Sequence, residues 1–124
     1  MIPGSDKDHP SFRHSFGFAI QGFLTALRTE RNIRVMLGGG VFALVMGFIL
    51  QLDLLSWAIV LICCGMVIAG ELMNTALETV VDLVSPEFHP LAGRAKDIAA
   101  AAVWTLSIVA AIVGIFVLIN AVIN

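Results

Sequence analysis

The stretch Leu54–Asp82, LLSWAIVLICCGMVIAGELMNTALETVVD, joins an uncharged run to a helix face that carries acids. Its first seventeen residues, Leu54 to Gly70, contain no charged side chain. At about 100° per residue, four of the polar residues that follow fall within about 80° of one another on a helix. These four, which we call the acid face, are Glu71, Asn74, Glu78 and Asp82. Like charges this close repel one another and destabilise the helix. A protein most readily keeps such a cluster where the acids bind a cation or transfer a proton.

The composition is that of a small integral membrane protein. Of the 124 residues, 59% are hydrophobic and 13% charged, whereas a soluble domain has about 45–50% and about 25%. We predict an all-α integral membrane protein with three transmembrane helices, at about 34–52, 54–83 and 94–123, because such segments can cross a hydrocarbon core of about 30 Å. The acid face would then lie at the membrane surface. A solvated helix face there is the alternative to a functional site.

The positions of the basic residues predict the orientation of these spans. They are Lys7, Arg13, Arg28, Arg31, Arg34, Arg94 and Lys96. All lie before or at the start of the first span, or in the region at 83–97 where the third span begins, and basic loops stay in the cytoplasm. We therefore expect the N-terminus and the loop at 83–97 inside and the C-terminus outside. The first span does not have the early position or the cleavage site of a signal peptide.

The regions around the spans complete the predicted architecture. Residues 1–10 form a short polar arm, and residues 11–124 a single domain. Over 11–31, apolar residues recur at helical spacing, which predicts an amphipathic helix lying at the membrane interface; packing on a soluble partner is the alternative. Small residues at Gly39, Ala43 and Gly47 favour close helix packing within or between subunits. The adjacent Cys63 and Cys64 are expected to be apolar filler.

The polar groups on the cytoplasmic side suit phosphoryl transfer to a membrane alcohol. Carboxylates hold Mg²⁺, which also takes phosphate oxygens, and an interfacial carboxylate can accept a proton from a lipid hydroxyl. Arg94 and Lys96 could neutralise a phosphoryl group, and free amides near Asp97 at a helix start would add an anion site. The positive-inside rule alone also explains these cations. No GxxxxGK[ST] or GxGxxG motif is present.

Two other classes of function remain open at this point. A non-catalytic membrane assembly subunit or scaffold would explain the spans, the small residues and the inside charges. It would not explain why three carboxylates and an amide share one helix face. A cation or proton pathway would use intramembrane acids, but it predicts acids deeper in the spans than the end of the second one.

The acid-face segment resembles the prokaryotic diacylglycerol kinase family, which includes the undecaprenol kinases. The resemblance rests on residues 71–82, Pro86-Glu-Phe-His89, residues 93–97 and Thr29-Glu-Arg-Asn-Ile-Arg34. It covers about residue 11 to the C-terminus. It implies a homotrimer in the bacterial cytoplasmic membrane, with active sites shared between subunits, that uses MgATP to phosphorylate a lipid alcohol. The forms of residues 29–32 and 85–90 favour undecaprenol over diacylglycerol. No nucleic-acid partner is expected.

The resemblance also implies roles for individual residues. Glu71 would be the general base that activates the lipid hydroxyl, and Glu30 and Glu78 would hold the Mg²⁺ ions. The remaining residues implied at the nucleotide side of the site are Phe18, Asn74, Asp82, Glu87, His89, Lys96 and Asp97. The chain departs from the family pattern at two places. The family usually has arginine near the position of Ser11, where the nearest here is Arg13, and often lysine at the position of Gln21.

Overall fold

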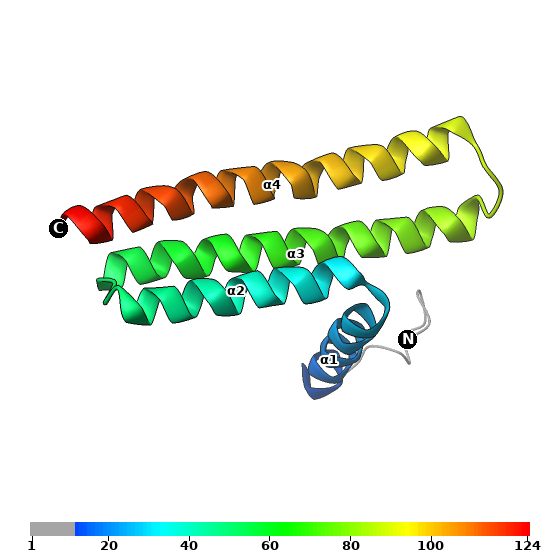
Figure 1. Ribbon diagram of the computed structural model, residues 1–124. Helices are drawn as coiled ribbons and strands as arrows, with labels where there is room; N and C mark the ends of the chain where they lie inside the picture. Colours follow the sequence, from blue (N-terminus) through cyan, green and yellow to red (C-terminus); the bar gives the residue numbers. More distant parts are fainter. Residues whose placement is uncertain (1–11) are drawn as a thin grey trace.

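The computed structural model describes residues 12–124, which form four helices joined by short connections. The helices are α1 (Phe12–Thr29), α2 (Arg31–Ile49), α3 (Leu54–Val84) and α4 (Pro90–Ile123). The three longer helices lie side by side with α3 between α2 and α4, and α1 is turned across them beside the start of α2 (Figure 1). The predicted all-helical fold is therefore confirmed. The predicted arm at 1–10 and the position of Ser11 lie outside the described residues.

The helices α2, α3 and α4 are long and apolar enough to cross a membrane, as the sequence predicted. Their large apolar side chains face outward; Phe42, Leu61 and Phe116 are each more than half exposed. Within residues 12–124, the buried apolar side chains are few: Ala26, Ile33, Val103 and Val117. A soluble monomer rarely exposes so much apolar surface. The surface suits a multi-pass membrane protein, whose helices satisfy their backbone groups internally.

Two glycines allow α3 to approach its neighbours closely. A Cβ atom added at Gly47 of α2 would lie 2.6 Å from the ring of Trp57 on α3. One added at Gly70 of α3 would lie 2.5 Å from Cδ1 of Leu106 on α4. The Trp57 ring also packs on Phe48, with ring centroids 5.0 Å apart. Small residues thus set the helix spacing at both faces of α3, as is usual for helices in lipid.

The hairpin between α2 and α3 is a tight turn with a helix cap. Gln51 has φ 53°, a left-handed conformation that is unfavourable for a residue with a side chain. Asp53 is the N-cap of α3, and its carboxylate accepts a hydrogen bond of 2.8 Å from the backbone N–H of Ser56. This bond lowers the pKa of Asp53. The cap gives α3 a defined start at Leu54.

The bend between α1 and α2 is closed by a guanidinium group. Glu30 is extended, with φ −111° and ψ 113°, and separates the two helices. Nη1 of Arg34 donates to the backbone oxygens of Leu27 and Arg28, at 2.8 and 3.1 Å. These carbonyls belong to the last turn of α1, where no following helical N–H is available to donate to them. The Glu30 side chain does not cap α2, so its carboxylate remains available for other contacts.

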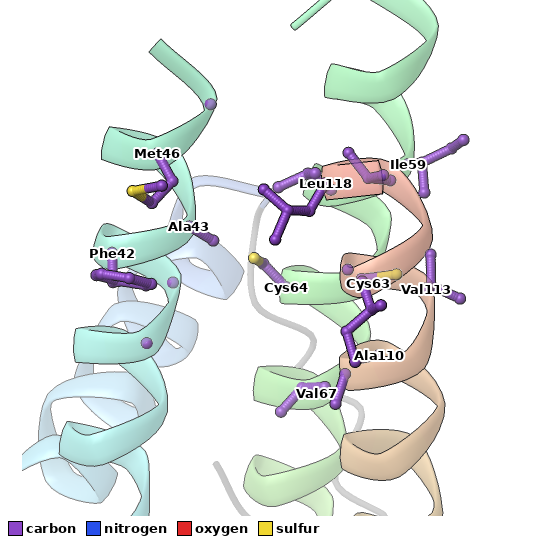
Figure 2. A pocket seen from close by; sticks show the side chains of 18 of the residues that line it. Phe42, Ala43, Met46, Ile59, Cys63, Cys64, Val67, Ala110, Val113 and Leu118 are labelled. Atoms are coloured by element: carbon purple, nitrogen blue, oxygen red, sulfur yellow. The ribbon is translucent and has the colours of Figure 1, made fainter. Parts of the chain in front are cut away.

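A cavity of about 680 Å³ lies between α2, α3 and α4. We call it the apolar groove. Figure 2 labels, among the residues that line it, Phe42, Ala43 and Met46 of α2 and Ala110, Val113 and Leu118 of α4. Cys63 and Cys64 of α3 are free thiols that line it. Its walls include several small residues: Gly39, Gly40, Ala43, Gly47, Ala110, Ala111 and Gly114. The groove therefore leaves space that a single chain does not fill.

Candidate functional site

The deep half of the acid face is buried where the α1–α2 bend meets α3. Glu71 is 2% exposed and Asn74 8% exposed. Ile33, at the start of α2, is fully buried. Glu78 is half-buried, and Asp82 is exposed. A solvated helix face would leave all four residues accessible, so that alternative holds for Asp82 and is wrong for Glu71 and Asn74.

Two further carboxylates lie close enough for their charges to act on Glu71. The negative charges close to it are those of Glu78, on the same helix, and of Glu30 at the α1–α2 bend. The amides of Asn32 and Asn74 lie beside the Glu71 carboxylate. The bend therefore brings Glu30 to the acid face, although the two are some forty residues apart in the sequence. Carboxylates this close repel unless a cation or a proton offsets their charge.

Asn74 joins this group and leaves one polar atom without a partner. Its Nδ2 donates to Oε1 of Glu78 at 3.2 Å. Its Oδ1 is buried and has no hydrogen-bond partner among the described residues. An unsatisfied buried acceptor costs about 1–3 kcal/mol, so it needs a structural or functional reason. Oδ1 of Asn74 can therefore accept a hydrogen bond or coordinate a cation.

These oxygens fit Mg²⁺ that arrives with a phosphate ligand better than a resident metal ion. Within residues 12–124, no three His, Cys, Asp or Glu side chains converge as a preformed metal centre. Mg²⁺ is commonly held by only one or two protein carboxylates, with phosphates and waters completing its octahedral shell. Glu30 and Glu78 can supply those carboxylates, and the unpartnered Asn74 Oδ1 is a further oxygen donor. The donor set therefore suits a metal–nucleotide complex.

A second group of predicted residues gathers at the loop between α3 and α4. A pocket of about 170 Å³ is lined by Asp82, Glu87, His89 and Lys96, among others. Lys96 forms an ion pair with Asp82, and its charge also interacts with that of Glu78. The acid face consequently continues from the buried Glu71 to an accessible basic side chain on α4.

The start of α4 differs from the sequence expectation. We expected a third span from about residue 94, with free amides near Asp97. The helix begins at Pro90, after His89, whose Nδ1 accepts a hydrogen bond of 3.1 Å from the N–H of Leu91. The N–H of Gly93 already donates to the backbone oxygen of His89. The amides around Asp97 are therefore used within the helix, and the expected anion site at free amides is wrong.

Phe18 and Asp97 have a different environment from the other predicted residues. Phe18 lies on α1 with 43% of its surface exposed. Asp97 is exposed on α4, and it makes no hydrogen bond or ion pair within the part of the chain that the structure describes. The fold thus gathers Glu30, the acid face and the α3–α4 loop, while these two side chains remain open to contacts from outside.

Sequence reasoning overlooked two polar residues at this site, Asn32 and Thr75. Asn32 lies beside Glu71, only two positions after the predicted Glu30. Thr75 has a buried Oγ1 with no partner among the described residues. Its position four residues after Glu71 puts it about 40° from Glu71 around the helix axis. The helical angle was therefore sufficient to include Thr75 in the acid face.

Known proteins share this sequence over most of its length. Residues 17–118 match the profile of the family described as prokaryotic diacylglycerol kinase. An undecaprenol kinase of Bacillus subtilis is 36% identical, covering 90% of this chain and 94% of that protein. A diacylglycerol kinase of Synechocystis is 41% identical, covering 85% and 61%, and one of Escherichia coli K12 is 33% identical, covering 77% and 79%. The chain therefore belongs to the prokaryotic diacylglycerol kinase family.

Proposed function

We propose that the chain is an ATP-dependent lipid kinase, which transfers the γ-phosphate of MgATP to the hydroxyl of a membrane lipid. The observation that carries the proposal is the buried Glu71, which has the charges of two further carboxylates, Glu30 and Glu78, close to it. It lies on α3 at the end of an apolar run long enough to span a membrane. A lipid hydroxyl at the membrane surface would reach that position without leaving the bilayer.

Glu71 is the proposed general base. Its carboxylate accepts the proton of the lipid hydroxyl as the hydroxyl oxygen attacks the γ-phosphorus. The bond between that phosphorus and the bridging oxygen of ADP breaks, and ADP leaves. Glu30 and Glu78 would hold Mg²⁺, which when bound neutralises negative charge on the phosphates. Asn74 keeps the Glu78 carboxylate in place through its hydrogen bond.

The nucleotide side of the proposed site lies toward α4 and its loop. Lys96 pairs with Asp82 and can turn to a phosphate, while Glu87 and His89 line the adjoining pocket and would border the adenosine. We place Phe18 and Asp97 at the nucleotide as well. Their exposure in a single copy is what a site completed by a second copy requires.

The proposal includes a homotrimer. Its support is the apolar groove, whose walls on α2 and α4 carry small residues that would let a helix of another copy approach. The interfacial placement of α1 is proposed on two observations. The helix is turned across the bundle (Figure 1), and its exposed Phe12 and Phe16 pack edge to face, with ring centroids 5.1 Å apart. Such rings suit a headgroup boundary.

We place the protein in the bacterial cytoplasmic membrane, with the N-terminus and the active site inside and the C-terminus outside. The basic residues before α2 and at the start of α4 support this orientation. It puts the acid face on the side where ATP is present. The domain is proposed to extend from residue 11 to residue 124.

Undecaprenol is the proposed lipid, which would make undecaprenyl phosphate the product. The relative named undecaprenol kinase is covered over 94% of its length, and residues 29–32 and 85–90 resemble the forms of that branch. Diacylglycerol, giving phosphatidic acid, is the alternative, because other relatives are named diacylglycerol kinases.

The test is transfer of labelled γ-phosphate by the purified protein in detergent, with undecaprenol and diacylglycerol offered separately. We expect transfer to undecaprenol and its loss in Glu71→Gln. Asp53→Asn is a matched control, because it also removes one negative charge but lies at the other end of α3 and keeps a capping side chain. Preference for diacylglycerol would change the lipid and keep the mechanism. Absence of transfer to either would favour a membrane scaffold.

A further inference from the structure

Thr75 differs from every other threonine in the chain. There are five threonines, and four donate to the backbone oxygen four residues earlier: Thr25, Thr29, Thr79 and Thr105. This is the usual bond of a hydroxyl within a helix. Thr75 does not form it. Its Oγ1 is buried and has no partner among residues 12–124, so its hydroxyl proton is available to a group that the single chain does not supply.

The position of Thr75 is between the proposed base and a proposed metal ligand. It lies about 6 Å along α3 from Glu71, while Glu78 lies about 10 Å along, and all three are within about 60° around the axis. A second unsatisfied atom, Oδ1 of Asn74, is at the same level. Two buried polar atoms without partners in the described residues therefore lie on the stretch of α3 between the proposed base and the proposed metal ligand.

A phosphoryl group in transit needs hydrogen-bond donors, and this part of the site is dominated by acceptors. The Glu71 and Glu78 carboxylates offer only oxygen acceptors. The nearby side-chain amides are engaged, since Asn74 Nδ2 bonds to Glu78 and Asn32 lies beside Glu71, while Lys96 is accessible at the nucleotide side of the proposed site. The Thr75 hydroxyl is the buried donor at this level with no protein partner in the described range.

We infer that Thr75 donates a hydrogen bond to an oxygen of the phosphoryl group during its transfer. This inference rests on the proposed lipid kinase function. In the step, the lipid oxygen bonds to phosphorus, the bond to the ADP oxygen breaks, and the lipid proton goes to Glu71. Thr75 keeps its own proton and stays neutral throughout. Charge that develops on the phosphoryl oxygens is stabilised by a donor already held in place.

The test compares Thr75→Val, which removes the hydroxyl and keeps the shape, with Thr75→Ser, which keeps the hydroxyl. Thr79→Val is the matched control, one helical turn on, whose hydroxyl bonds to the helix in the ordinary way. With undecaprenol, or diacylglycerol if that is the lipid accepted, we expect Thr75→Val to lower kcat about 100-fold. The KM for MgATP should change little, as for an interaction made in the transition state. Thr75→Ser and Thr79→Val should keep parental kcat.

Each outcome decides the inference. Equal kcat in Thr75→Val and Thr79→Val, with the parent active, would overturn it and leave the proposed function intact. Loss of activity in Thr75→Ser as well, together with changed assembly in detergent, would assign the side chain to packing and also overturn it. A parent that phosphorylates neither lipid would remove the proposed function and this inference together.

Discussion

The two ends of α3 are incomplete in opposite ways. At the acid face, Glu71 and Asn74 are buried among polar groups, and two buried oxygens have no hydrogen-bond partner within residues 12–124. At the apolar groove, no charge is present and space is what remains unfilled. Unsatisfied polar atoms call for a ligand, whereas unfilled apolar space calls for packing. We therefore assign the chemistry to the acid face and the packing of the helices to the apolar groove. Substitutions at the first should change kcat, and substitutions at the second should change stability.

The largest effect is expected for Glu71→Gln. The amide keeps the shape of the side chain but cannot take a proton, and loss of a general base costs about 10²–10⁴-fold in rate. We expect kcat to fall about 1000-fold while MgATP binding and thermal stability are kept. Replacing a buried carboxylate near two others removes repulsion. Steady-state kinetics, equilibrium nucleotide binding and thermal unfolding in detergent check this. A variant that unfolded well below the parent would show that chemistry and cohesion are not separate.

A smaller effect is expected for Glu78→Gln and for Glu30→Gln. Each removes one proposed Mg²⁺ ligand and should raise the Mg²⁺ concentration for half-maximal rate by at least about 10- to 100-fold, since even partners outside the ligand shell have effects of that size. A Mg²⁺ titration at fixed ATP measures it, with Asp53→Asn as the charge-matched control. An unchanged titration in both glutamate variants would remove the metal from these two side chains.

The packing at the apolar groove is tested by Gly47→Ala. The new methyl group would lie 2.6 Å from the Trp57 ring, and overpacking of this kind destabilises by about 1–3 kcal/mol. We expect a lower unfolding temperature and unchanged kcat for the protein that stays folded. Gly65→Ala is the matched control on α3, because no atom of the described part of the chain lies within 4 Å of its added Cβ. A change in kcat without a change in stability would contradict the assignment of this region to packing.

The smallest expected effect is for Gln51→Gly in the α2–α3 hairpin. A left-handed residue with a side chain is strained by about 1–2 kcal/mol, and part of the relief is offset by the greater freedom of glycine in the unfolded chain. We expect a gain in stability of up to about 1 kcal/mol with no change in kcat. Gln51→Ala should give no gain. Thermal unfolding of the three proteins side by side is the measurement.

The helical architecture could be predicted from the sequence because it depends on local patterns. Uncharged runs and helical spacing predicted four helices, three of them long and apolar. The shared face of Glu71 and Asn74 followed from their angular positions alone. The pattern of residues 94–97 predicts a start of α4 that is later than the observed one at Pro90. His89 and Pro90 provide a cap and a first helical residue that end the loop earlier.

Burial and the approach of distant residues could not be predicted in this way. Spacing shows which residues share a face, but not whether another helix covers that face. How close the Glu30 charge lies to Glu71 depends on the angle between α1 and α2. That angle is held by hydrogen bonds from Arg34, which the sequence pattern marks only as a positive charge. The roles of the site residues stay predictions until the variants above are measured.

The cap that Arg34 places on α1 also fixes how many residues this bend can contain. Arg34 reaches carbonyls six and seven positions before it, across the extended Glu30. One residue inserted after Arg31 would turn the rest of α2 by about 100° and shift it by about 1.5 Å. That single change would move the guanidinium away from α1 and turn Gly47 away from Trp57. Insertions and deletions among homologues should therefore spare this bend and accumulate at the chain ends and in the α3–α4 loop.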